Sequence, residues 1–212
     1  MTAGPTREFF DSVRFISNPS TGKMGYAVAI EAARRGHDVV LITGPVDLLP
    51  PDGMKVIHVL NAGQMLEACV AEFHASHAAV MTAAVCDYRP ARCLPRKLKK
   101  RNRPRTVRLL PTTDILSRLA KTKGARVVVG FAMEDHDEHQ HAEDKLRRKR
   151  CDAIVLNGPG NVGSDDACIQ ILRHDIGWCA PQSGTKAQMA VVVMDTVEHL
   201  LGRPLTVPDN TV

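Results

Sequence analysis

The sequence predicts an α/β fold, with a Rossmann-like doubly wound and mainly parallel sheet, a small antiparallel extension and a protruding basic loop. Short apolar runs alternate with amphipathic helical patterns along most of the chain, which is the order of elements in a parallel sheet with helical crossovers. The runs are continuously hydrophobic, as in strands that are covered on both faces. The chain has 212 residues, 44% of them hydrophobic, without an internal repeat or a low-complexity linker, so one domain over 1–212 is expected.

The elements are expected in alternation along the first three quarters of the chain. The expected strands are 38–43, 54–59, 78–85, 126–132 and 152–156, and the expected helices are 22–36, 62–76, 112–122 and 137–150. Only three residues precede Gly4, so the buried strand that usually opens such a fold is expected to be truncated. Ligands of doubly wound folds bind beyond the carboxyl ends of the strands.

The pattern changes after Asn157. A glycine-rich loop leads to two runs that are able to pair, 168–173 and 176–180, and then to a final helix over 185–202. These segments predict the small antiparallel extension.

The segment 89–108 carries ten Lys or Arg residues and no acid. Its prolines and dense charge exclude a central helix or strand, so it is expected to protrude as a basic flap. Clustered cations call for a polyanionic partner, which is either a nucleic acid or the phosphates of a small molecule.

A cytoplasmic protein without membrane contact is expected. No apolar run approaches the roughly 18 residues of a membrane helix, and the N-terminus lacks the apolar core of a secretory signal. The six cysteines are scattered without a Cys-x-x-Cys pair, which indicates reduced residues. The histidines at 136, 139 and 141 have a spacing that suits a metal site, but their acidic surroundings favour a solvated helix start.

The segment 17–25 (SNPSTGKMG) precedes an apolar helix. Small, hydroxyl and glycine residues at that position expose backbone N–H groups at the positive end of the helix dipole, which suits a phosphate. The alternative is an ordinary helix start capped by Ser20 or Thr21. The next strand runs into Gly44-Pro45 rather than an acidic residue that would hold a ribose, which disfavours an NADP-dependent oxidoreductase.

Two further segments suit a nucleotide site. Ala83 and Ala84 end an apolar run and allow close approach of a ligand, and Asp87 follows at the carboxyl strand end or else caps a turn. In the basic flap, the lysines of 97–100 (KLKK) are able to close over a triphosphate, although such charge runs are often solvated surface.

These segments, with TAGPTRE (2–8), TGPV (43–46), PTTDIL (111–116), VVGFAMED (128–135), KLRRKRCDAIVLN (145–157) and TKAQMA (185–190), resemble the bacterial phosphopantothenoylcysteine synthetases, the synthetase domain of the DNA/pantothenate metabolism flavoprotein family. The resemblance implies a stand-alone ligase that joins 4′-phosphopantothenate to cysteine. It further implies CTP as co-substrate with Mg²⁺, an acyl-cytidylate intermediate, a homodimer and no bound FMN.

The resemblance also implies roles for individual residues. Asn18 is similar to the amide that holds the acyl group of the intermediate, and Arg14 to an arginine that reaches the substrate phosphate across a dimer interface. Ala83, Ala84 and Asp87 match the strand end that lines the substrates, with Asp87 a candidate metal contact. Lys97 matches a lysine associated with forming the cytidylate. The residues implied to contact the nucleotide are Ser20, Gly22, Lys23, Asp87, Lys97, Lys99 and Phe131.

The chain departs from the family pattern at Pro19, at Thr21, at 133–135 and at 157–159, which leaves the nucleotide contacts and the choice between CTP and ATP open. A nucleic-acid-binding protein that uses 89–108 remains an alternative from another class. The chain has only two Tyr, five Phe and one Trp, so few aromatic side chains are available to stack on bases.

Overall fold

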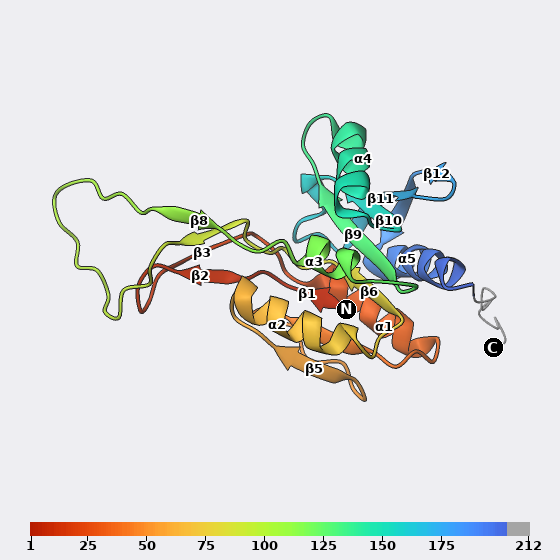
Figure 1. Cartoon of the computed structure of the whole chain (residues 1–212), viewed down its shortest axis with the longest axis horizontal. Coiled ribbons are helices and arrows are strands. Elements are labelled where there is room, and N and C mark those ends of the chain that lie inside the picture. The colour runs from red at the N-terminus through yellow and green to blue at the C-terminus, as the bar shows by residue number, and fades with distance from the viewer. Residues whose placement is uncertain (203–212) are drawn as a thin grey trace.

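The computed structural model describes residues 1–202 and confirms the predicted fold class. Six parallel strands lie in the order β5-β4-β1-β6-β9-β10 within a nine-stranded sheet (Figure 1). This is the strand order of a doubly wound dinucleotide-type fold. The strands are β1 (Thr2–Ala3), β4 (Val40–Thr43), β5 (Lys55–His58), β6 (Ala78–Met81), β9 (Val127–Met133) and β10 (Ala153–Asn157).

The first strand is two residues long and lies at the centre of the sheet. Thr2 pairs with Ile42 of β4 on one side and with Met81 of β6 on the other. The parallel pairing continues past the named strand as a bridge between Pro5 and Ala84. The centre of the sheet therefore extends toward its carboxyl edge through loop segments.

The antiparallel extension follows β10. Strand β11 (Asp166–Arg173) pairs with β10, with β12 (Gly177–Trp178) and with β13 (Gln182–Thr185). The predicted pairing of 168–173 with 176–180 is confirmed, since Leu172 lies opposite Trp178. Strand β13 was not predicted, because its sequence QSGT carries no apolar signal.

Helices cover both faces of the sheet, as the alternation predicts. They are α1 (Lys23–Arg34), α2 (Ala62–Phe73), α3 (Ile115–Lys121), α4 (Glu138–Lys149) and α5 (Lys186–Leu200), with a short 3₁₀ helix at Pro159–Asn161. One buried cluster joins the sheet to α1 and α5, and a second joins it to α2, α3 and α4. Neighbouring residues of a strand serve opposite faces: Leu41 belongs to the first cluster and Ile42 to the second. Among residues 1–202, no helix is both long enough and apolar enough to cross a bilayer.

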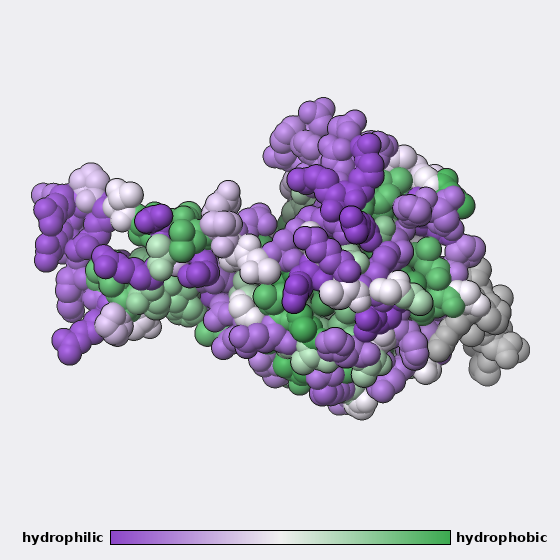
Figure 2. All heavy atoms as spheres, viewed as in Figure 1, coloured by the Kyte–Doolittle hydropathy of each residue, from purple (hydrophilic) through white to green (hydrophobic). Residues whose placement is uncertain are grey.

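An arm projects from the sheet (Figure 1). It consists of the hairpin β2 (Arg7–Phe9)–β3 (Phe15–Ser17), the pair β7 (Tyr88–Pro90)–β8 (Leu109–Pro111) and the loop 91–108. The predicted protrusion of 89–108 is confirmed, whereas the β2–β3 hairpin was not predicted. Figure 2 shows hydrophobic side chains along the arm and hydrophilic ones at its tip. The large apolar side chains exposed on the arm are Val13, Phe15, Ile16, Tyr88, Val107 and Leu109.

Candidate functional site

The turn before α1 leaves the start of that helix free of side-chain caps. The N-cap residue is Gly22, which has the left-handed conformation (φ 76°). Among residues 1–202, no side chain caps α1 by accepting a hydrogen bond from its first N–H groups. The alternative that Ser20 or Thr21 caps the helix is therefore wrong. Ser20 instead accepts a hydrogen bond from the Gly22 N–H at 3.4 Å. Because the first N–H groups of a helix lack partners within the helix, they are available to an anion.

Glycines allow this turn to lie against the strand ends. A Cβ added to Gly25 would lie 2.4 Å from Thr82 Oγ1 and 2.6 Å from the Ala3 side chain, so α1 packs directly on β1 and the end of β6. A Cβ on Gly44 would lie 1.7 Å from the Pro5 carbonyl oxygen. These contacts explain why both the TGPV and the GKMG segments carry glycine at those positions.

The segment that follows β6 is held by hydrogen bonds to two other segments of the chain. Ala84 N–H donates to the Gly4 carbonyl at 2.9 Å, and Cys86 N–H donates to Thr6 Oγ1 at 3.0 Å. Thr112 binds the same segment from the other side, since its N–H donates to the Asp87 carbonyl at 2.8 Å. These hydrogen bonds fix the backbone of residues 84–87 beyond the end of β6.

Asn18 joins the turn to this strand end. Its Nδ2 donates to the Val85 carbonyl at 3.0 Å, and the neighbouring Ser17 hydroxyl donates to the Thr6 carbonyl at 2.7 Å. Asn18, Ala83, Ala84 and the start of α1 therefore lie around one carboxyl edge of the central strands. Doubly wound folds bind their ligands at this edge.

The basic loop is anchored to the β2–β3 hairpin by a buried carboxylate. Asp11 Oδ2 accepts from Leu98 N–H at 3.1 Å and from Arg14 Nη2 at 2.6 Å, and Arg14 Nη2 also donates to the Leu98 carbonyl at 2.6 Å. Burial alone would raise the pKa of Asp11, but hydrogen bonds from the backbone of Arg14, Leu98 and Val13 and from the Arg14 side chain hold it well below its usual range. This anchor places Arg14 beside the exposed Lys97 and Lys99.

Comparisons with known proteins show the family of the chain. A family model described as the DNA/pantothenate metabolism flavoprotein C-terminal domain matches residues 1–201. The chain belongs to this family. The resemblance inferred from the sequence motifs is thereby confirmed.

Curated relatives of the flavoprotein C-terminal domain family are named coenzyme A biosynthesis bifunctional protein CoaBC. The protein of Mycobacterium tuberculosis is 41% identical over 218 residues, which cover 95% of this chain and 52% of the relative. The protein of Bacillus subtilis is 45% identical over 181 residues, which cover 82% of this chain and 44% of the relative. The chain spans about half the length of the curated relatives that it matches.

Two solved structures have the same fold. The C-terminal domain of a coenzyme A biosynthesis bifunctional protein CoaBC superposes with a TM-score of 0.81 at 34% identity. The match covers 95% of this chain and 93% of the solved domain. A Cab2 mutant in complex with phosphopantothenate-cysteine superposes with a TM-score of 0.75 at 15% identity, which shows the fold alone.

Within one protomer, the predicted site residues form two groups. The first group surrounds the strand ends and contains Asn18, Ser20, Gly22, Lys23, Ala83, Ala84 and Asp87. The second group lies on the arm and contains Arg14, Lys97 and Lys99. Phe131 lies in β9, opposite Val155 of β10. No hydrogen bond or ion pair joins these two groups among residues 1–202.

Two cavities lie away from the predicted residues. A cavity of about 490 Å³ lies at the opposite edge of the sheet and is lined by residues such as Met1, Val40 and Ala78. A second cavity of about 420 Å³ lies between β2, the start of α2 and β7. Neither of the two is lined by a predicted site residue.

Two lysines hold the loop after β10: Lys23, which was predicted as a site residue, and Lys186, which was not. Lys23 Nζ contacts Asp165 Oδ1 at 2.6 Å, and Lys186 Nζ donates to the Asn161 carbonyl at 3.0 Å and to the Ser164 carbonyl. Lys186 is buried, and burial followed by repulsion from Lys23 lowers its pKa. Lys186 belongs to the TKAQMA segment, which was identified in the sequence. The sequence does not show that this lysine binds the loop that contains Asn161 and Ser164.

Two partly buried lysines of α4 were not singled out from the sequence. Lys149 Nζ lies 3.2 Å from Asp114 Oδ2 at the start of α3. Burial and then repulsion from Lys149 lower the pKa of Lys145, one turn earlier on the same helix face. The run KLRRKR (145–150) shows that this part of the helix is strongly basic. The sequence does not show which of these cations face the interior.

Proposed function

We propose that the chain is a phosphopantothenate–cysteine ligase, which activates 4′-phosphopantothenate with CTP and then forms an amide with cysteine. The observation that carries the proposal is the hydrogen bond from Asn18 to the end of β6, because it joins the uncapped start of α1 to the strand end that bears Ala83 and Ala84. A triphosphate beside the free N–H groups of α1 would lie next to an acyl group held at that strand end. Membership in the pantothenate metabolism family supports the same substrates.

The first half-reaction is a displacement at phosphorus. A carboxylate oxygen of phosphopantothenate attacks the α-phosphorus of CTP, the bond between that phosphorus and the bridging oxygen breaks, and pyrophosphate leaves. Such a transfer depends mainly on positioning and on neutralising charge. The start of α1 and Lys23 would orient the phosphates, and the exposed Lys97 and Lys99 would neutralise the leaving pyrophosphate.

The second half-reaction forms the amide. The amine of cysteine attacks the acyl carbon, the bond from that carbon to the phosphate oxygen breaks, and CMP leaves with the electron pair. The Asn18 amide would hold the acyl group at the Val85 strand end during this step. Mg²⁺ would supply further charge neutralisation, and the exposed Asp87 carboxylate offers the oxygen ligand that this ion prefers.

We further propose a homodimer, in which the arm of one copy covers the strand ends of the other. The exposed apolar side chains of the arm support an interface with a second copy, since contiguous exposed apolar surface marks interaction sites. A second copy would also bring together the two groups of site residues that lie apart in one protomer.

A pyrophosphate-release assay tests the proposal. The chain is mixed with Mg²⁺, phosphopantothenate and cysteine, and with CTP or ATP side by side. We expect CTP to give equal amounts of CMP and pyrophosphate, together with the amide product detected by mass spectrometry. Release that does not depend on phosphopantothenate, or no release with either nucleotide, would overturn the ligase assignment, and faster release with ATP would overturn only the choice of CTP.

A further inference from the structure

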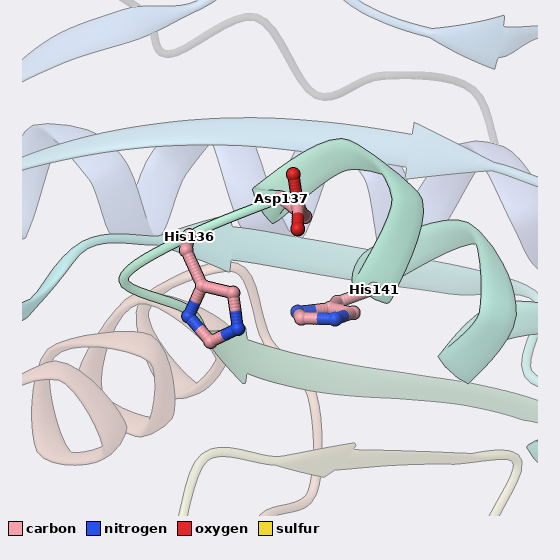
Figure 3. Close-up of side chains that lie close together, drawn as sticks. All are labelled: His136, Asp137 and His141. Atoms are coloured by element: carbon pink, nitrogen blue, oxygen red, sulfur yellow. The ribbon is translucent and has the colours of Figure 1, made fainter.

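The link between β9 and α4 brings two imidazoles and a carboxylate together. The ligand atoms of His136, Asp137 and His141 all lie within 4.8 Å of one another. Figure 3 shows the two rings edge-on to each other with the Asp137 carboxylate beside them. The ring centroids of His136 and His141 are 5.0 Å apart at an interplanar angle of 86°. Both rings can therefore present a nitrogen to the same point.

Asp137 is placed to act as a ligand because its side chain has no structural task. It is the N-cap of α4, but its carboxylate accepts no capping hydrogen bond. Its backbone has a positive φ of 45°, which is uncommon for a residue other than glycine. His141 follows four residues later and therefore lies on the same face of the helix; its N–H donates to the Asp137 carbonyl at 3.0 Å.

Each histidine has a carboxylate on one nitrogen and leaves the other for a ligand. Nδ1 of His136 lies 2.5 Å from Asp135 Oδ1, and Nδ1 of His141 lies 3.3 Å from Glu134 Oε2. Histidines that bind metals usually donate their second ring nitrogen to such a partner, which fixes the tautomer and the ring orientation. These contacts leave Nε2 of each ring as the nitrogen that would bind a metal ion.

His139 is engaged elsewhere, although it lies between the two in sequence. Its Nε2 lies 2.9 Å from Gln170 Oε1, and its ring packs against Trp178 with centroids 4.4 Å apart. Of the three histidines at this helix start, only two therefore face the shared point, and Asp137 takes the third position.

We infer that His136, Asp137 and His141 form a binding site for a divalent transition-metal ion of the Zn²⁺ class. Imidazole nitrogens with one carboxylate suit Zn²⁺, Co²⁺ or Ni²⁺, whereas Mg²⁺ prefers oxygen ligands. Three protein ligands leave a fourth tetrahedral position open to water. The ligand atoms of a tetrahedral Zn²⁺ site lie about 3.3 Å apart, so a bound ion would draw the three present atoms, which lie within 4.8 Å of one another, closer together. Residues 134–138 contain four acids, which favours a cation.

Calorimetric titration of the untagged full chain with ZnCl₂, NiCl₂ and MgCl₂ tests the site, and Co²⁺ absorption reports the coordination geometry. We expect one Zn²⁺ per chain and a weaker response to Mg²⁺. His141→Ala should weaken binding by more than about 100-fold, and Asp135→Asn, which removes only the partner of His136, by about 10-fold. His139→Ala is the matched control and should bind as the unchanged chain does.

Several outcomes would overturn the site. These are an absence of saturable Zn²⁺ binding, an equal loss of affinity in His139→Ala and His141→Ala, or Mg²⁺ binding as tight as Zn²⁺. Circular dichroism of each variant establishes that it is folded, so a loss of binding is not mistaken for a loss of structure. The titration contains no nucleotide, so its result does not depend on whether the chain is a ligase.

Discussion

At the residue scale, the Asn18 amide is the polar group that connects the turn before α1 with the strand end after β6. Replacing it with aspartate puts a carboxylate oxygen opposite the Val85 carbonyl, where a donor is needed. We expect Asn18→Asp to slow amide formation by about 100-fold, as loss of one positioned donor does, while pyrophosphate release continues and the acyl-cytidylate accumulates. Quenched-flow analysis with radiolabelled CTP measures both steps.

The control for this variant is Asn102→Asp, an exposed asparagine in the loop 91–108. It should leave both half-reactions within about twofold of the unchanged chain, as is usual for surface substitutions. An equal loss of both half-reactions in Asn18→Asp would contradict the role of the amide in the second step.

Lys97 is expected to act earlier in the reaction. It is exposed on the loop whose neighbouring Leu98 is fixed by Asp11 and Arg14, so its ammonium group can reach a nucleotide without disturbing a fold contact. We expect Lys97→Gln to slow formation of the acyl-cytidylate by about 100-fold. Pre-steady-state pyrophosphate release measures this step, with Lys121→Gln as a matched exposed control. An unchanged burst would show that Lys97 does not neutralise the leaving group.

The positions of residues were predictable where they follow from a local motif and not where they follow from packing. Asn18 and Gly22 belong to one short segment, so the sequence indicated both. The partners of His136 and His141 depend on how far α4 is rotated against β9, which no spacing fixes. His139 fits the same periodicity but faces Trp178 instead.

At the element scale, a buried ion-pair network joins α1 to α5. The Arg35 side chain is 2% exposed, and its guanidinium contacts Glu31 Oε1, Asp195 Oδ1 and Glu198 Oε2, each at 2.7 Å. Removing one member of a buried network leaves the others uncompensated. We expect Arg35→Ala to lower the free energy of unfolding by about 3 kcal/mol, measured by urea denaturation.

Arg34 provides the control, because it contacts the same Glu31 carboxylate but its side chain is 53% exposed. Arg34→Ala should cost less than about 1 kcal/mol, as exposed ion pairs do. Similar losses in the two variants would show that burial of the network does not set its contribution.

The anchor between the hairpin β2–β3 and the loop 91–108 has a defined pH dependence. Hydrogen bonds hold the pKa of Asp11 well below its usual value, so the charged form is favoured in the folded chain. Its contribution to stability is therefore fully present above the ordinary aspartate pKa of about 3.9 and is lost as the pH falls through the lowered value.

Asp11→Asn should release the loop at neutral pH, because the amide is uncharged and cannot accept from Arg14 and Leu98 as a carboxylate does. We expect faster tryptic cleavage within 91–108, by about 10-fold, with Asp47→Asn as a control outside the anchor. Mass spectrometry locates the cuts. Equal cleavage rates in both variants would contradict the anchor.

Elements with a clear apolar pattern were predicted, and those that depend on polar contacts were not. The five apolar runs became β4, β5, β6, β9 and β10 because a strand covered on both faces needs such a run. The hairpin β2–β3 lies outside the core, and β13 is almost entirely polar. Their pairing depends on the arm and on β11, which the alternation of apolar residues does not describe.

At the scale of the whole molecule, the arm carries apolar surface and cations away from the strand ends (Figures 1 and 2). Arg14 of the β2–β3 hairpin donates a hydrogen bond to the Leu98 carbonyl of the loop 91–108. If the hairpin contacts a second copy, Lys97 is therefore carried to the same surface. In the proposed homodimer, one complete site therefore takes Asn18 from one copy and Lys97 from the other.

This arrangement predicts complementation between two inactive variants. When Asn18→Asp and Lys97→Gln chains are mixed, unfolded and refolded together, half of the dimers are mixed and each contains one site with both residues intact. We expect amide formation to recover to about a quarter of the unchanged rate, whereas each variant refolded alone stays inactive. Sedimentation velocity establishes that all three samples are dimers. If Asn18 and Lys97 act within one chain, the mixed dimers contain no intact site, and the mixture would remain as inactive as its components.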